Sequence, residues 1–150
     1  ILENSGKSFI RLKDEMQTLQ LYLDIEKMRT SEMFDYEIET EDDLDMMHIS
    51  VPPLIIQPFV ENAIWHGILP GEQKGKITIQ LRRLNERTLQ CIVTDNGIGI
   101  DRSREIKNDS NRKSMGMEIT AERLNNKSAI LAEQLSQGGT RVTLQIPTAA

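Results

Sequence analysis

Two segments with alternating apolar and polar residues, 76–84 and 89–94, constrain the fold of this chain most strongly. A period of two is typical of a β-strand that buries one face. The four residues 85–88 between them are enough for a hairpin connection, so these strands are predicted to pair antiparallel. Segments 34–38 and 140–146 show the same alternation and predict two further strands.

Helical periodicity accounts for most of the other apolar residues. Over residues 11–30 they recur at steps of three and four, which predicts an amphipathic helix. Residues 54–66 are predicted to form a second helix, with Pro58 tolerated only near its first turn. A third helix is predicted over residues 116–126, and two short strands are predicted over residues 48–51 and 129–134. Loops are predicted over residues 41–45, 69–75, 95–100, 101–113 and 138–139, which are rich in charge, proline or glycine.

This order of elements predicts an α/β (α+β) two-layer sandwich, in which helices cover one face of a mixed, mostly antiparallel sheet. The chain has 150 residues, enough for one domain. Its formal net charge of −5 argues against nucleic acid as the main partner. The single cysteine, Cys91, excludes an intrachain disulfide. The chain starts at Ile1 rather than methionine, and we expect it to be a piece of a longer protein.

The segment QPFVENAIWHG, residues 57–67, places three polar side chains in an apolar run. Burying Glu61 or Asn62 costs free energy unless each finds a partner. The amide oxygen of Asn62 suits Mg²⁺, which prefers hard oxygen ligands, and Glu61 could act as a general base. For His66 alone, a plain helix end is favoured, with Gly67 as the residue that terminates the helix.

The segment TDNGIGI, residues 94–100, follows a predicted strand and places Asp95 at its end. Gly97 and Gly99 allow the backbone to approach a ligand closely. A carboxylate there could accept a hydrogen bond from an exocyclic amine such as that of adenine. Taken alone, the segment favours an ordinary turn, because Asp-Asn-Gly is common in turns.

Two weaker signals lie towards the C-terminus. SMGMEITAERL begins at Ser114 and places Gly116 at the start of a predicted helix, where free amides favour phosphate oxygens. The alternative is a capped surface helix with Ser114 as its N-cap. GGTRV, residues 138–142, is a turn that enters a strand, and the hydroxyl of Thr140 could face a ligand.

Together these segments form an ordered set that resembles the N, G1 and G2 boxes of the GHKL ATPase superfamily. Members have the Bergerat fold, which binds ATP between a helical layer and a mixed sheet. Within that superfamily the chain is most similar to LytS/YehU-type sensor histidine kinases, because LQLYLDIEKMR precedes VPPLIIQPFVENAIWHG. The resemblance extends from Leu12 to Pro147.

The resemblance implies ATP and Mg²⁺ as cofactors, with Asn62 as the metal ligand. Glu61 and Asn62 would be catalytic, and Asp95 would hold the adenine amine. Residues 101–115 would form a lid over ATP. The other implied contacts to the nucleotide are His66 at the pocket edge, Gly97, Gly99, Ser114, Met115, Gly116, Met117 and Thr140. Residues 1–30 would be a linker and helix that join an absent phosphoacceptor region, and residues 31–150 the ATP-binding domain.

The implied activity is transfer of the γ-phosphate of ATP to a histidine outside this chain, on the parent's own phosphoacceptor helix. The implied parent is a homodimer, anchored in the bacterial inner membrane, with this domain in the cytoplasm and a LytTR-type response regulator as partner. Two residues depart from the family pattern, since Ser114 stands where glycine is usual and Ile119 where asparagine is common. A PHFLFN-like phosphoacceptor motif is absent from the sequence.

Two other functions remain open from the sequence. One is a GHKL hydrolase or an anti-sigma-type serine kinase, against which the proline-rich VPPLIIQP and the preceding helix argue. The other is a non-catalytic module that senses nucleotide or supports dimer contacts, which Ser114 and Ile119 favour and the intact Asn62 and Asp95 oppose.

Overall fold

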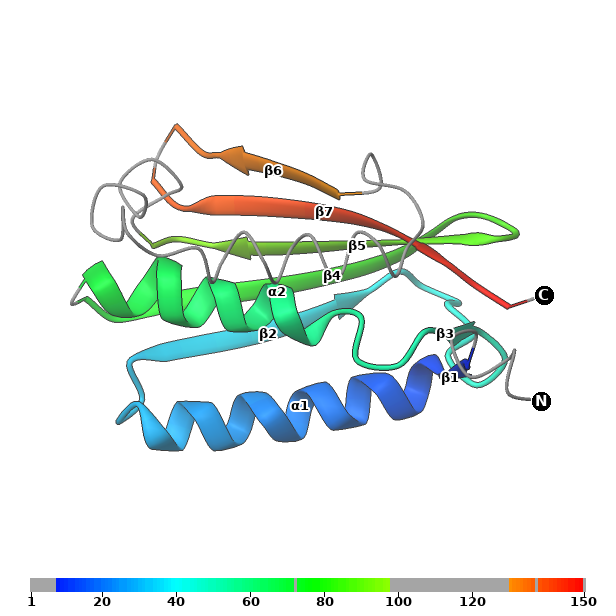
Figure 1. Cartoon of the computed structure of the whole chain (residues 1–150), viewed down its shortest axis with the longest axis horizontal. Coiled ribbons are helices and arrows are strands. Elements are labelled where there is room, and N and C mark those ends of the chain that lie inside the picture. Colours follow the sequence, from blue (N-terminus) through cyan, green and yellow to red (C-terminus); the bar gives the residue numbers. More distant parts are fainter. Residues whose placement is uncertain (1–7, 72, 98–129, 137, 150) are drawn as a thin grey trace.

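The structure, a computed structural model, describes residues 8–71, 73–97, 130–136 and 138–149. It contains a five-stranded sheet with the order β2-β4-β5-β7-β6 (Figure 1). The strands are β2 (Phe34–Thr40), β4 (Gly75–Asn85), β5 (Thr88–Asp95), β6 (Ile130–Gln134) and β7 (Thr140–Pro147). Strand β2 runs parallel to β4, and the other neighbours pair antiparallel. The predicted mixed, mostly antiparallel sheet is therefore confirmed.

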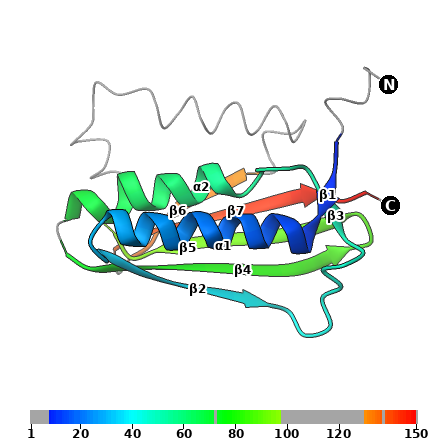
Figure 2. The same ribbon diagram turned by 90° about the horizontal axis from the view of Figure 1, so that it is seen from below.

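Two helical segments cover one face of this sheet (Figures 1 and 2). Helix α1 (Leu12–Arg29) agrees with the predicted helix over 11–30 to within one residue at each end. Its apolar side chains recur at helical spacing, and four of them lie in the core, at Leu12, Met16, Leu19 and Leu23. The second layer of the predicted sandwich is therefore confirmed, and α1 packs into the same core as the sheet.

The second helical segment differs from the helix predicted over 54–66. It begins three residues later, as α2 (Gln57–Asn62), and continues as a π-helix, η2 (Ala63–Ile68), before a short 3₁₀ turn, η3 (Leu69–Gly71). Residue Leu54 has a φ of 55°, which no helix can include. Pro58 lies at the N-terminal end of α2, where the amide that it lacks has no helical partner anyway.

A separate two-stranded pair lies at one end of the sheet. It is formed by β1 (Ile10–Arg11) and β3 (Ser50–Val51), which pair antiparallel. The strand predicted over 48–51 is therefore shorter and does not join the main sheet, because His48 still belongs to a turn in which its amide bonds Asp45. The helix predicted over 116–126 and the loop over 101–113 lie outside the described residues.

The core forms between the helices and the alternating positions of three strands. Residues that face the helices are buried, and those between them are more exposed, as the burial of β4, β5 and β7 shows. In β5 the buried row runs Leu89, Cys91, Val93 and then Asp95. The row in β7 begins with Thr140 and continues through Val142. The buried rows of β5 and β7 thus each have a polar residue at one end, on the face that the helices cover.

A buried carboxylate joins α1 to the start of α2. Glu15 is 2% exposed, and its two oxygens accept hydrogen bonds from the amides of Leu54 and Ile55, at 3.0 Å and 3.1 Å. These two amides belong to the irregular turn that precedes α2, so neither has a partner within a helix. The charge-assisted bonds stabilise this turn and with it the point where α2 begins.

Replacing Glu15 with alanine is expected to lower the free energy of unfolding by about 2 kcal/mol, because two amides lose a charged acceptor. Chemical denaturation of the chain measures the loss. Asp14→Ala is the matched control, since Asp14 is the exposed carboxylate next to Glu15 in the same helical turn. Equal losses in the two variants would contradict the role of Glu15.

Candidate functional site

Asp95 and Thr140 lie opposite each other at one end of the sheet. They are partners in the antiparallel register of β5 and β7. Asp95 is 5% exposed, and Thr140 is 8% exposed. The backbone amide of Gly97 donates a 2.9 Å hydrogen bond to Oδ1 of Asp95. The two polar residues predicted from separate parts of the sequence are therefore brought together, on the helix-covered face of the sheet.

Three glycines surround the carboxylate and the backbone of Asp95. A Cβ atom on Gly67 would lie 2.8 Å from Oδ1 of Asp95. A Cβ atom on Gly139 would overlap the carbonyl oxygen of Asp95, and one on Gly97 would overlap the carbonyl oxygen of Gly67. The π-helix, the end of β5 and the turn before β7 therefore meet at Asp95, and a side chain at any of these three positions would displace neighbouring atoms.

Asn96, the residue after Asp95, is hydrogen-bonded to the start of β4. The side-chain oxygen of Asn96 accepts a 2.8 Å hydrogen bond from the backbone amide of Lys76. The backbone amide of Asn96 donates a hydrogen bond to the carbonyl oxygen of Lys76. These bonds fasten the segment after β5 to the start of β4. The chain that leaves Asp95 is thus held in place before Gly97.

Asn62 and His66 lie on the helical segment that contains Gly67. Asn62 is the last residue of α2, His66 lies in η2, and both are half-buried. The predicted role of Gly67 as the residue that terminates the helix is wrong. The helix continues through Ile68, with a backbone bond from the amide of Leu69 to the carbonyl oxygen of Ile64, five residues earlier.

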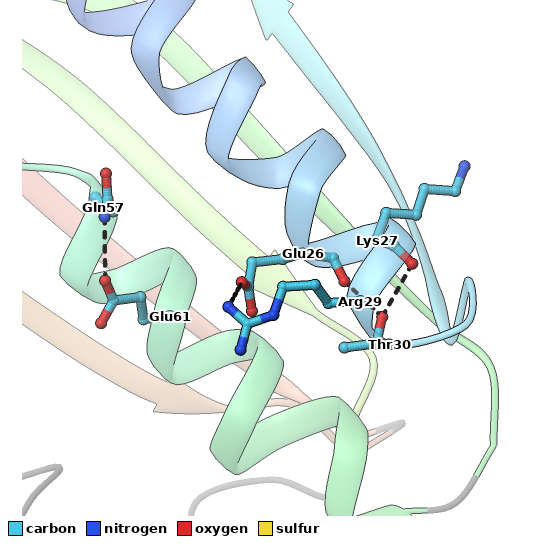
Figure 3. A network of polar contacts seen from close by, with 6 residues as sticks. All are labelled: Glu26, Lys27, Arg29, Thr30, Gln57 and Glu61. Carbon is cyan, nitrogen blue, oxygen red and sulfur yellow. Dashed lines mark hydrogen bonds and ion pairs between the residues drawn. The ribbon is translucent and has the colours of Figure 1, made fainter.

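Glu61 lies beside Gln57 on α2, as Figure 3 shows. Its Oε1 atom accepts a 3.2 Å hydrogen bond from Nε2 of Gln57 on the same helix, and Glu61 is exposed. On α1, the buried carboxylate of Glu26 accepts a 2.8 Å bond from Nη1 of Arg29 (Figure 3). The hydrogen bond of Glu61 thus stays within α2 and joins it to the residue one turn earlier.

Electrostatic effects on Tyr22 place Glu61 near α1. Burial raises the pKa of the Tyr22 hydroxyl, and the negative charges of Glu61 and Glu26 raise it further. A hydrogen bond with Trp65 and the positive charge of Arg29 both lower this pKa. Tyr22 therefore stays protonated at neutral pH and links α1 to η2 through Trp65.

Several residues predicted for the site cannot be placed. Gly99 and the four residues Ser114 to Met117 lie outside the described residues. Within the described part of the chain, no group of three or more His, Cys, Asp or Glu side chains could hold a metal ion. A metal that needs only one or two protein oxygens, as Mg²⁺ does when phosphates and waters supply the rest, remains compatible with Asn62.

Gly67 is the site residue that sequence reasoning missed. Its position after a helical pattern pointed to a helix terminus, which is the commonest reason for a glycine there. In the structure its φ is not among the positive values found for the described glycines, Gly138 and Gly139. Its lack of a side chain is instead explained by the contact with Asp95, which no pattern in the sequence reveals.

Comparison with known protein families identifies the fold. Residues 52–150 match the family described as histidine kinase-, DNA gyrase B-, and HSP90-like ATPases. The chain is 30% identical to the Staphylococcus aureus sensor histidine kinase/phosphatase LytS, over 97% of this chain and 26% of LytS. It is 30% identical to Bacillus subtilis YwpD, over 89% of this chain and 49% of that protein. The Escherichia coli sensor histidine kinase YpdA is 37% identical over 61% of this chain.

Solved structures with the same fold include the catalytic domain of the histidine kinase ThkA. It aligns with a TM-score of 0.65 at 18% identity, over 93% of this chain and 95% of that domain. The mycobacterial sensor histidine kinase MprB aligns with a TM-score of 0.64 at 13% identity, over 94% of this chain. These similarities show a shared fold.

Replacing Gly139 with alanine is expected to destabilise the chain more than the same change at Gly138. Both glycines have a positive φ, 96° and 97°, so both variants bear a similar backbone strain. Only at Gly139 would the new Cβ overlap the carbonyl oxygen of Asp95, whereas at Gly138 the nearest atom lies at 3.7 Å. We expect a difference of about 1–3 kcal/mol in the free energy of unfolding, measured by chemical denaturation. Indistinguishable losses would show that the close packing at Asp95 is not required.

Proposed function

This chain belongs to the histidine kinase-, DNA gyrase B-, and HSP90-like ATPase family as a LytS-type member, and we propose that it catalyses phosphate transfer from ATP to a histidine. The histidine would lie on a segment outside this chain. The observation that carries the proposal is the buried Asp95 at the end of β5, opposite Thr140 and beside the helical segment that contains Asn62.

Asp95 is suited to recognise the adenine base. Its carboxylate is held by the Gly97 amide and lies where the apolar row of β5 ends, so an aromatic base would meet apolar residues and one charged acceptor. A charged acceptor bonded to an exocyclic amine gives a short and strong hydrogen bond. Thr140 lies across from it in β7 and supplies a hydroxyl at the same end of the sheet.

Asn62 is suited to hold Mg²⁺ through its amide oxygen. It is half-buried at the end of α2, and that donor set fits an ion that keeps several waters and shares its ligands with phosphates. When bound, Mg²⁺ would neutralise phosphate charge. The chain's own residues would orient the nucleotide and keep it in place, so no covalent intermediate on this chain is expected.

The remaining predicted residues complete the proposed site. Gly99 and the residues from Ser114 to Met117 would line the base and meet the phosphates through backbone amides, and His66 would lie at the pocket edge. Glu61 stays a proposed catalytic residue. Its hydrogen bond to Gln57 within α2 favours a role in positioning Asn62, its neighbour in the same helix.

The parent protein is proposed from its relatives. The chain spans 49% of the length of YwpD and 26% of the S. aureus LytS. We therefore propose that residues 1–30 join the domain to a preceding phosphoacceptor helix in a homodimer. One structural relative was solved as a complex of the kinase ThkA with the response regulator protein TrrA, which supports a response regulator, here proposed to be of the LytTR type, as partner.

The proposed location is the cytoplasmic side of a membrane-anchored bacterial sensor, because S. aureus LytS is named as a sensor kinase. Among the helices that the structure describes, none is both long enough and apolar enough to span a membrane.

A transfer assay tests the proposed activity. The chain is mixed with ATP, Mg²⁺ and the region of S. aureus LytS that carries its phosphoacceptor histidine, and phosphohistidine is measured by its acid lability. Asn62→Ala is expected to reduce transfer by about tenfold or more through loss of a metal ligand, and to leave binding of metal-free ATP unchanged. Gln17→Ala, which alters an exposed polar residue of α1, is the control.

Two results of the transfer assay would contradict the proposed function. Steady phosphate release without phosphohistidine would favour a hydrolase. ATP binding with neither reaction would favour a non-catalytic nucleotide-binding module.

Replacing Asp95 with asparagine is expected to weaken ATP binding by about 10- to 100-fold, the loss of one hydrogen bond to a charged group. The asparagine keeps the size of the side chain and removes its charge. Calorimetric titration with ATP and Mg²⁺ measures the change. The control is Asp45→Asn, because Asp45 is an exposed carboxylate in a turn between β2 and β3. Unchanged affinity of Asp95→Asn would contradict base recognition by this residue.

A further inference from the structure

Gly67 lies next to the carboxylate of Asp95. A Cβ atom at this position would lie 2.8 Å from Oδ1, 3.0 Å from Cγ and 3.1 Å from Oδ2 of Asp95. All three nearest atoms belong to one carboxylate, and none belongs to the backbone. A side chain at this position would therefore have to displace the functional group of Asp95 itself.

This contact differs from those of the other two glycines at the site. At Gly97 and Gly139 an added Cβ would overlap carbonyl oxygens of the backbone, so a side chain there must move the chain itself. At Gly67 the obstacle is the end of a side chain, which can rotate. An alanine at position 67 can thus be accommodated by moving the Asp95 carboxylate away from the Gly97 amide, which now holds it at 2.9 Å.

The π-helix brings Gly67 to this place. The bond from the amide of Leu69 to the carbonyl oxygen of Ile64 closes a turn that is one residue longer than an α-helical turn. Ile64 and Ile68 remain buried in the core on either side of Gly67. The backbone at Gly67 is therefore fixed by core packing, and short π-helical turns of this kind are frequent at functional sites.

We propose that Gly67 is a positioning residue for base recognition: its missing side chain leaves the Asp95 carboxylate where it can accept a hydrogen bond from the exocyclic amine of a purine. This inference rests on the proposed function, in which Asp95 contacts the base. It adds that the π-helical turn forms one wall of the base pocket and that selectivity for an amine-bearing base depends on residue 67.

A double-mutant cycle tests the proposal. Affinities for ATP, and for an ATP analogue that lacks the 6-amino group, are measured by calorimetry for wild type, Asp95→Asn, Gly67→Ala and the double variant. We expect Gly67→Ala to weaken ATP about tenfold and the analogue by less than about threefold, since only ATP has the amine. In the Gly67→Ala background, Asp95→Asn should then cost less than about threefold.

Several outcomes would overturn the proposal. If Gly67→Ala weakens both nucleotides equally, or if the cost of Asp95→Asn is the same in both backgrounds, Gly67 does not act through Asp95. If Asp95→Asn alone has no effect, the proposed function fails together with this inference. If Asp95→Asn weakens ATP and Gly67→Ala does not, only this inference fails.

Stability measurements keep the proposal testable if Gly67→Ala folds poorly. Removing the carboxylate with Asp95→Ala should restore the melting temperature of the Gly67→Ala variant, because the steric conflict is with that group. Leu19→Ala, a buried change in α1, is the control for general destabilisation, and Asp95→Ala should not restore it. Failure to restore stability in the Gly67→Ala background would show that the conflict lies elsewhere and would overturn the proposal.

Discussion

The register between β5 and β7 places two polar residues on the buried face of the sheet, and the rest of the site depends on this placement. Because side chains alternate along a strand, Asp95 must face the helices if Leu89, Cys91 and Val93 do. Thr140 is its partner in β7 and faces the same way. A carboxylate at the edge of an apolar layer needs partners, and the Gly97 amide is one of them.

The helical layer approaches this carboxylate closely. The turn before α2 is fastened to α1 by Glu15, which sets where α2 begins. Buried isoleucines at 64 and 68 then fix η2 on the sheet. Glycine at 67 lets the helix backbone lie close to the carboxylate, because an added Cβ would be only 2.8 Å from its Oδ1 atom. Loss of the Glu15 bonds or of the buried isoleucines would therefore be expected to shift the helix relative to Asp95.

Much of the fold and part of the site could be predicted from the sequence. The hairpin of β4 and β5 follows from alternation, and α1 follows from its period of three to four. The start of α2 does not follow from the sequence, because the bonds from the amides of Leu54 and Ile55 to Glu15 join residues 39 and 40 positions apart. The π-helix was missed because its pattern of apolar residues resembles that of an α-helix over so short a segment.

The sequence by itself determined which residue types are available, their spacing, and the strand faces on which Asp95 and Thr140 lie. These are local properties, since they depend on periods of two and of three to four residues. Only the tertiary structure decided that Gly67 lies next to Asp95 and that the charge of Glu61 acts on Tyr22 of α1. Contacts of this kind depend on how one layer is placed on another, and that placement results from the packing of the whole core.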